Sequence, residues 1–367
     1  MRGIMVHSLM ARGVPFDAAY ETAERVRQKV RDRGTVTAAE LAKLVSEMIG
    51  EDSGGPSFAP APPPAISVER ESGRGEPFSK GVLAQSLLAA SLDATDAFQA
   101  AVEIESEIRR QRRTDIKRRE LRKLVFETLL SRFGEKTAER YLIWRRYQEP
   151  DRPVIILLGG TTGAGKTSVA LEVARRLGIR RVMSTDSIRQ VMRLTLSRDL
   201  MPAIHASSFE AHLGMNLPED VEEPVIEGFL AQAAIVTVGV RALVERAIKE
   251  NTSLVLDGVA LVPGLIDLEA YAEEAHVIPL VIANLDEEAF AGRFEARGDR
   301  QALRQTHRYL EHLEAILRIQ NHFLELADRH GVPIVDNVAV ESSVQLIIRH
   351  VSETLRKKAE YSLEELL

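Results

Sequence analysis

The stretch LLGGTTGAGKTS, residues 157–168, decides the fold of this chain. It contains four glycines, and glycine costs backbone entropy inside a helix or a strand. The residues before it, 154–158, form a short apolar run that is typical of a strand buried in a parallel sheet. The apolar residues after it recur at helical spacing until Gly178. The glycines are therefore expected in a tight turn between a strand and a helix, where a ligand approaches the backbone.

This turn matches a phosphate-binding motif. Residues 160–167 fit G-x-x-x-x-G-K-[ST], in which backbone N–H groups surround a phosphate at a helix N-terminus. In this motif Lys166 contacts the β- and γ-phosphates, and the Thr167 hydroxyl coordinates Mg²⁺. A glycine-rich turn that binds nothing is the alternative, but both flanking elements favour nucleotide binding. We expect ATP and Mg²⁺ as cofactors, with the nucleotide bound by Gly160, Thr161, Thr162, Gly163, Ala164, Gly165, Lys166, Thr167 and Ser168.

Composition limits the other classes of function. The 367 residues suggest two or three domains, and a hydrophobic content of 45% can fill their cores. The net charge of -6 argues against a general nucleic-acid binder. The absence of cysteine excludes disulfides, thiolate zinc sites and cysteine nucleophiles. No signal peptide is recognisable and the apolar stretch 229–240 is short for a bilayer span, so we expect a cytoplasmic enzyme with no membrane or nucleic-acid partner.

The N-terminal part of the chain contains an internal repeat. Residues 51–77 are rich in Pro, Gly and Ser and predict an extended linker. The segments on either side, 1–50 and 78–147, resemble each other, with Gly3 matching Gly81. Their apolar residues follow helical spacing, so we predict two copies of a small all-α, three-helix unit. These repeats are also candidates for a homo-oligomer contact.

Residues 148–355 show a different pattern, followed by a C-terminal tail at 356–367. Short β-branched runs alternate with helical segments, which predicts an α/β fold with a parallel sheet covered by helices on both faces. Ligands bind such sheets at the carboxyl ends of the strands. The predicted strands are 154–158, 181–183, 253–256, 277–282 and 333–335, and the predicted helices are 167–177, 186–195, 220–249 and 301–330.

Asp186 lies where the second predicted strand meets its helix. Arg189 and Arg193 follow one and two helical turns later on the same face. A carboxylate in this position can accept a hydroxyl proton while the arginines hold an anionic substrate. A capped helix with a solvated basic stripe is the alternative. Beside a phosphate-binding loop we favour the functional interpretation.

Other candidate residues follow the later strands. Asp257 ends the third strand, where a carboxylate would orient Mg²⁺, although an Asp-Gly turn is the alternative. Arg293 and Arg297 begin a basic cluster after the fourth strand. They belong either to a solvated helix face or to a lid that stabilises charge on the γ-phosphoryl group. His205 and Ser207 are candidates for the substrate pocket, and the histidines show no metal-site spacing.

Several segments together resemble the 2-phosphoglycerate kinase family: GGTTGAGKTSVALEVARRLGI, TDSIRQVMR, HASSF, VLDGVALVPG and RYLEHLEAILRIQNHF. The resemblance covers about residues 154–351, and this ordered set is far more specific than the phosphate loop alone. It implies a P-loop kinase that phosphorylates the hydroxyl of 2-phosphoglycerate with ATP, giving 2,3-bisphosphoglycerate. It also implies an N-terminal ATP-cone-like domain, which both helical repeats resemble.

The chain departs from the family pattern in two places. The family has Glu and His where this chain has Asp257 and Ala260, a difference that bears on the substrate more than on phosphoryl transfer. The repeats also lack the basic, glycine-containing start of an ATP-cone. Two alternatives stay open: a P-loop kinase for another small hydroxylated acceptor, and a non-catalytic ATP-sensing regulatory protein. Asp186 argues against the sensor, because a switch needs no base on the substrate side.

Overall fold

The computed structural model divides the chain into two compact units, Met1–Pro64 and Ala65–Leu367. In the first unit the structure describes helix α2 (Phe16–Val30), whose buried positions recur every three or four residues, at Ala19, Ala23, Val26 and Val30. This spacing is that of an amphipathic helix, as the repeat predicted. The structure describes residues 16–30, 66–69, 75–147, 151–286 and 308–358, together with Leu9, Glu40, Leu44, Val45, Glu47 and Phe290.

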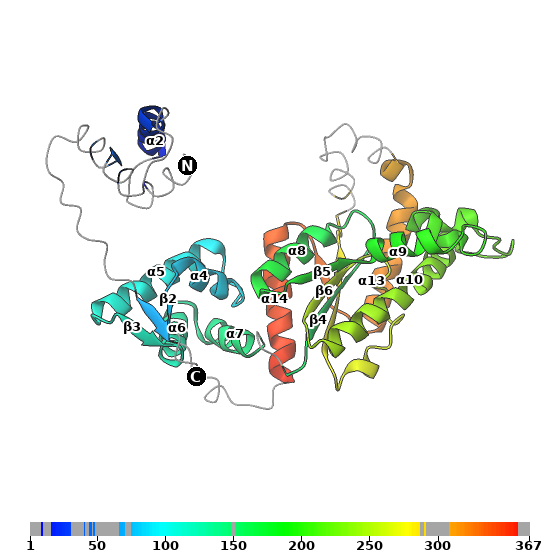
Figure 1. Ribbon diagram of the computed structural model, residues 1–367. Coiled ribbons are helices and arrows are strands. Elements are labelled where there is room, and N and C mark those ends of the chain that lie inside the picture. Colours follow the sequence, from blue (N-terminus) through cyan, green and yellow to red (C-terminus); the bar gives the residue numbers. More distant parts are fainter. Residues whose placement is uncertain are drawn as a thin grey trace. The chain divides into compact units, whose positions relative to one another are not determined.

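A five-stranded sheet organises residues 151–358 (Figure 1). Its order is β5-β6-β4-β7-β8, and every neighbouring pair is parallel. All six residues of the central strand β4 are buried, because helices cover both faces of the sheet. The five predicted strands are confirmed, with bounds β4 (Val154–Gly159), β5 (Arg181–Ser184), β6 (Leu254–Asp257), β7 (His276–Ala283) and β8 (Ile334–Asp336).

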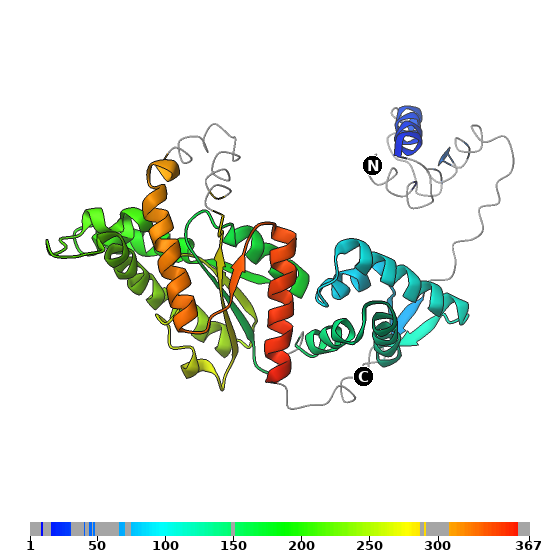
Figure 2. The same ribbon diagram turned by 180° about the vertical axis from the view of Figure 1, so that it is seen from behind.

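The side chains of β4 alternate between two cores. Ile156 and Leu158 pack with α8 and α14, whereas Ile155 and Leu157 pack with α10. Figures 1 and 2 show α8 and α14 on one side of the sheet and α10 and α13 on the other. The helices that cover the sheet are α8 (Lys166–Leu177), α9 (Thr185–Thr195), α10 (Pro224–Lys249), α13 (Leu313–Arg329) and α14 (Val340–Lys357), and the short 3₁₀ segments are η1 (Pro202–His205), η2 (Ser208–Gly214) and η3 (Glu269–Tyr271).

Helix α10 is longer than the apolar stretch at 229–240 indicates. By length and composition alone it is the one helix in the described ranges that could cross a membrane. A buried core helix has the same properties, and α10 contributes Phe229, Ala233 and Val236 to one apolar core and Val240 to another. Gly239 also brings α10 close to α9, since a Cβ at that position would lie 2.4 Å from a side-chain carbon of Ile188.

Residues 66–147 form a helical unit with a small sheet. The described helices are α4 (Lys80–Leu88), α5 (Ala94–Arg110), α6 (Arg118–Phe133) and α7 (Glu135–Arg146). The sheet has the order β2-β1-β3, from strands β1 (Ser67–Glu69), β2 (Gly75–Pro77) and β3 (Asp115–Lys117). The prediction of an all-α repeat missed this sheet. Strands β1 and β2 also lie within 51–77, so the folded unit begins inside the predicted linker and not at residue 78.

Helix α7 belongs to two cores at once. Its Ala138, Tyr141 and Leu142 pack among residues of α4, α5 and α6. Its Ile143 and Trp144 pack instead with α8 and α14 of the larger domain. The indole Nε1 of Trp144 donates to the carbonyl of Leu177 at 3.0 Å, which satisfies the single hydrogen-bond donor of the buried ring. The helical unit and the sheet domain are therefore packed together through this helix.

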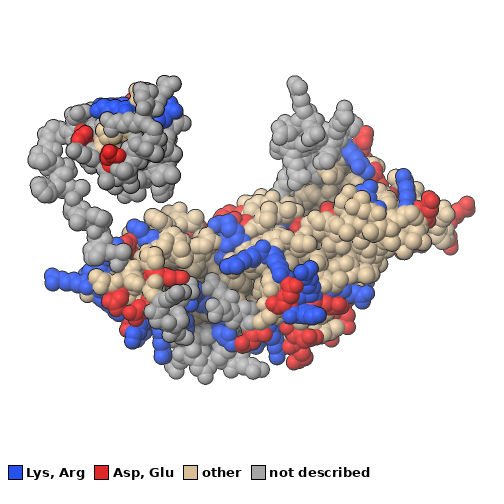
Figure 3. Space-filling model, in the orientation of Figure 1, with Lys and Arg blue, Asp and Glu red and all other residues tan. Residues whose placement is uncertain are grey.

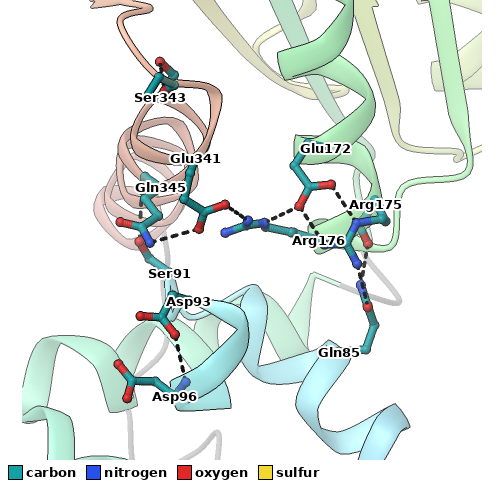
Figure 4. Close-up of polar contacts among 11 residues, drawn as sticks. Gln85, Ser91, Asp93, Asp96, Glu172, Arg175, Arg176, Glu341, Ser343 and Gln345 are labelled. Atoms are coloured by element: carbon teal, nitrogen blue, oxygen red, sulfur yellow. Dashed lines mark hydrogen bonds and ion pairs between the residues drawn. The ribbon is translucent and has the colours of Figure 1, made fainter. Parts of the chain in front are cut away.

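Polar contacts extend the same junction (Figure 4). Gln85 of α4 donates to the Arg175 carbonyl at 2.8 Å and accepts from the Arg175 guanidinium at 3.1 Å. The Ser91 hydroxyl donates to the carbonyl of Gln345 in α14 at 3.1 Å. The Gln85 contacts are with α8 and the Ser91 contact is with α14, the two helices that cover one face of the sheet. The unit at 66–147 thus rests on the C-terminal end of α8 and on α14.

These contacts predict where the chain can be shortened. A chain that begins at Ala65 should keep the melting temperature of the full-length protein, because it removes a separate compact unit. A chain that begins near Lys136 should melt at a much lower temperature, since Tyr141 and Leu142 would lose their partners in α4–α6. Each apolar side chain that the truncation exposes should lower the free energy of unfolding by about 1.5–3 kcal/mol. Thermal denaturation followed by circular dichroism checks both, and equal melting of the shorter chain would contradict the shared core.

Candidate active site

The phosphate-binding loop joins β4 to α8 at the carboxyl edge of the sheet. Gly160 has φ +138°, and a Cβ there would lie 2.1 Å from the Ile282 carbonyl oxygen of β7. Only glycine allows this approach. Gly165, in the left-handed conformation with φ +82°, is the N-cap of α8 and offers no side chain to its first amides. These amides and the positive end of the helix dipole suit an anion.

Lys166 is folded against its own loop. Its Nζ donates to the Thr161 carbonyl at 2.7 Å, and only 8% of the residue is exposed. Burial lowers the pKa of Lys166 to about 8, against the opposing attraction of Asp257 and Asp186. The Thr161 hydroxyl donates in turn to the Ile316 carbonyl of α13 at 3.3 Å. The Lys166 amine therefore contacts the phosphate-binding loop and can gain or lose its proton near pH 8.

Thr167 and Asp257 meet beside Lys166. The Thr167 hydroxyl donates to Asp257 Oδ2 at 2.7 Å, and Asp257 is 2% exposed. Its other oxygen, Oδ1, is buried and has no hydrogen-bond partner among the described residues. Burial raises the pKa of Asp257, while the Thr167 hydroxyl and the Lys166 charge partly offset this effect. A hydroxyl beside an unpaired carboxylate oxygen is a hard donor set that fits Mg²⁺.

Asp186 lies near these groups in the first turn of α9. Ser184 at the end of β5 pairs in register with Asp257, and the Asp186 charge acts on both Lys166 and Asp257. The helix cap is Ser184, whose hydroxyl accepts from the Asp186 N–H at 3.1 Å. The capping alternative for the Asp186 side chain is therefore wrong. That side chain is 63% exposed and accepts from Arg189 Nη2 at 3.2 Å.

The two arginines of α9 differ in what they contact. Arg189 Nη1 donates to the carbonyls of Ile204 and Ala206, at 3.2 and 2.7 Å. The buried Gln232 of α10 donates to Ala206 as well, at 3.1 Å. Arg189 thus holds η1 in place and leaves Asp186 as its exposed partner. Arg193 donates to Gln190 Oε1 at 3.1 Å one turn further along.

The remaining predicted residues fall into two groups. His205 Nε2 lies 2.9 Å from the Leu196 carbonyl, which ties η1 to the end of α9. Ser207 is half-buried at the start of η2. Arg293 and Arg297 lie outside the described residues, so their role in a lid stays a prediction.

Two asparagines at neighbouring strand ends, Asn284 and Asn337, are not among the residues predicted from the sequence. Asn284 follows β7, and its backbone N–H and carbonyl both pair with the Gln320 amide of α13, at 3.1 and 2.9 Å. Its own amide is buried without a partner in the described ranges. Asn337 follows β8 and donates to the Ala164 carbonyl of the phosphate loop at 2.8 Å. A polar residue directly after a mostly buried strand is a sequence signal for Asn284, whereas Asn337 follows a partly exposed edge strand and has no such signal.

Comparison with known proteins identifies the family of this fold and site. Residues 66–150 match the ATP cone domain, and residues 139–202, which include the phosphate loop, match the zeta toxin family. A 2-phosphoglycerate kinase of Methanothermobacter thermautotrophicus is 39% identical, covering 79% of this chain and 95% of that protein. The chain belongs to the 2-phosphoglycerate kinase family.

Other relatives agree with this family. A 2-phosphoglycerate kinase of Pyrococcus furiosus is 36% identical, with 81% of this chain and 98% of that protein covered. One of Methanopyrus kandleri is 38% identical, with 77% and 85% covered. Among solved structures, a gluconokinase from Sinorhizobium meliloti aligns with 59% of this chain at 16% identity and a TM-score of 0.34, too low for comparison of details. The predicted P-loop kinase and its ATP-cone domain are confirmed.

The charge of Lys166 predicts a pH-dependent affinity for ATP. Phosphates favour the protonated amine, so nucleotide binding should draw a proton onto Lys166 above its pKa of about 8. The Kd for ATP should rise with pH above this value, approaching about tenfold per pH unit. Calorimetric titration in buffers of different ionisation enthalpy checks the proton uptake directly.

Lys166→Arg is the matched control for this titration. A guanidinium stays charged throughout this pH range, so its ATP affinity should be weaker but independent of pH around 8. A flat profile in the wild-type protein, or the same slope in Lys166→Arg, would exclude Lys166 as the titrating group.

Proposed function

We propose that this chain transfers the γ-phosphoryl group of ATP to the hydroxyl of 2-phosphoglycerate, giving 2,3-bisphosphoglycerate. The proposal is supported above all by family membership over most of the chain. It is supported locally by the meeting of Lys166, Thr167, Asp257 and Asp186 at one edge of the sheet. Phosphoryl transfer depends mainly on positioning and on stabilising charge, and these residues supply both.

Nucleotide binding is assigned to the loop and the start of α8. The first amides of α8 are uncapped by a side chain, so they can donate to phosphate oxygens. Lys166 would leave the Thr161 carbonyl and donate to the β- and γ-phosphates. Thr167 and Asp257 would hold Mg²⁺, which offsets the phosphate charge when it is bound. The breaking of the Lys166–Thr161 contact is part of the cost of binding ATP.

Asp186 is assigned the role of general base. The acceptor oxygen forms the new bond to the γ-phosphorus, the bond to the ADP oxygen breaks, and the hydroxyl proton passes to the Asp186 carboxylate. Arg189 keeps this carboxylate oriented, since it holds Asp186 at 3.2 Å and is itself fixed to η1. An exposed carboxylate in this position can be reached by a substrate, whereas the buried Asp257 cannot.

Arg193 is the better candidate of the two α9 arginines for binding an anionic acceptor. Arg189 Nη1 donates to two backbone carbonyls, while among the described residues Arg193 donates only to the Gln190 side chain. His205 and Ser207 on the adjoining η1–η2 segment would complete the acceptor pocket. Arg293 and Arg297 are assigned to the lid, where they would meet the charge on the transferred group.

The acceptor can be tested with radiolabelled ATP against a panel of hydroxy acids. We expect transfer to 2-phosphoglycerate at a kcat/KM at least about a hundredfold above that for unphosphorylated glycerate, because arginine sites left without their anion lose binding energy. Comparable transfer to a sugar acid or a nucleoside would favour another acceptor. ATP binding without transfer to any of them would favour the sensor.

Asp186→Asn tests the assignment of the base. The variant keeps the shape of the side chain, and Ser184 still caps α9, so the melting temperature should not change. Turnover with 2-phosphoglycerate should fall by a factor of about 10² to 10⁴, the usual contribution of a general base. The Kd for ATP should stay near that of the wild type, because the loop binds the phosphates.

Ser184→Ala is the matched control on the same turn. It removes the cap and should destabilise the protein by about 0.5–2 kcal/mol while kcat changes little. Unchanged turnover in Asp186→Asn, or an equal loss of turnover in Ser184→Ala, would rule out the general base.

A further inference from the structure

Asn337 links the last strand of the sheet to the phosphate loop. Its backbone N–H donates to the Ala283 carbonyl of β7 at 2.8 Å, which fixes the chain just after β8. Its side-chain Nδ2 donates to the Ala164 carbonyl at 2.8 Å. The residue is 1% exposed, so its amide lies inside the protein. This contact joins residues 173 positions apart in the sequence.

Ser343 holds this amide in one orientation. Its hydroxyl, in the first turn of α14, lies 2.9 Å from Asn337 Oδ1 and 3.1 Å from the Ala339 carbonyl, and it donates to the nearer Asn337 oxygen. The oxygen of the amide is thereby held toward α14, and the NH₂ group faces the loop. An amide turned by 180° would set its oxygen against the Ala164 carbonyl oxygen, two acceptors with no proton between them. Ser343 is fully buried, so water does not replace it easily.

The start of α14 is itself fixed to α8 (Figure 4). Glu341 forms an ion pair with Arg176 of α8, whose side chain is buried and also pairs with Glu172 at 2.7 Å. A buried guanidinium between two carboxylates keeps the two helices in register. Ser343 therefore acts from a rigid support, and α8 is the helix that begins with Lys166.

The Ala164 carbonyl matters because of the next residue. A trans peptide is planar, so the Ala164 carbonyl and the Gly165 N–H point in opposite directions. Gly165 is in the left-handed region at φ +82°, and glycine permits other rotations at little cost. Because the Ala164 carbonyl is held toward Asn337, the Gly165 N–H points the opposite way, away from Asn337. Without this contact the peptide is free to turn its carbonyl toward the phosphates.

We propose that Asn337, oriented by Ser343, is a positioning residue that fixes the Ala164–Gly165 peptide for phosphate binding. The inference rests on the proposed function only in taking ATP as the nucleotide. It requires no contact between Asn337 and ATP. A loop whose binding-competent conformation is populated a tenth of the time binds about tenfold more weakly.

The test measures ATP binding by calorimetry on the full-length protein, independently of any acceptor. Asn337→Ala and Ser343→Ala should each raise the Kd for ATP, by about tenfold and by a smaller factor respectively. The kcat at saturating ATP should change by less than about twofold, since bound ATP restores the loop. If Asn337→Ala does not fold, Ser343→Ala decides alone.

Ser352→Ala is the matched control. Ser352 lies on the same helix and is fully buried, and its hydroxyl has no partner among the described residues. This variant should leave the Kd for ATP unchanged. An unchanged Kd in folded Ser343→Ala, or an equal rise in Ser352→Ala, overturns the proposal. Failure to phosphorylate 2-phosphoglycerate would refute the proposed acceptor and leave this binding test intact.

Discussion

The phosphate loop lies so close to β7 that residue 160 can carry no side chain. A Cβ there would fall 2.1 Å from a backbone oxygen, and backbone in a central strand has nowhere to move. This contact sets the height of the loop above the sheet and hence the start of α8. The positions of Lys166 and Thr167 follow from it, because both belong to the first turn of that helix. Parallel pairing then brings Asp257 and Ser184 to the same level from the neighbouring strands.

Charge is distributed unevenly around this edge. Lys166 and Asp257 are both buried, and burial shifts each pKa toward the neutral form of its group. Perturbed pKa values of this kind cluster at functional sites. On the face seen in Figure 3, acidic and basic side chains are interspersed along the lower border, whereas uncharged surface predominates toward the upper right.

Much of this arrangement could be predicted from the sequence, for a physical reason. The central strands β4 and β6 are buried on both sides, so they appear as continuous apolar runs, and polar residues that end such runs meet at one edge. Asp257 is identified in this way and Thr167 by the phosphate-binding motif, and the two side chains are in contact. Strands β1–β3 were missed because three residues are too few to show a period, and the composition around β1 and β2 resembles that of a linker.

Long-range contacts explain the rest of the differences. The spacing of Arg189 shows that it shares a face with Asp186, but not that η1 folds back to receive its guanidinium. Ser184 and Asp186 are both good capping residues, and only the backbone conformation shows that Ser184 caps α9. Asn337 belongs to no sequence motif, because its role depends on a contact with a loop 173 positions away in the chain.

The position of α7 in two cores also affects how genetic data on this protein are interpreted. Ala138 and Leu142 pack in the core of the helical unit, yet they help to stabilise a helix that the sheet domain contacts through Ile143 and Trp144. A substitution at either position lowers the amount of folded enzyme, and marginal stability makes even about 1–2 kcal/mol visible as reduced abundance. Loss of activity in such an allele indicates that less of the protein is folded. It says nothing about nucleotide sensing by the ATP-cone until the specific activity per folded molecule has been measured.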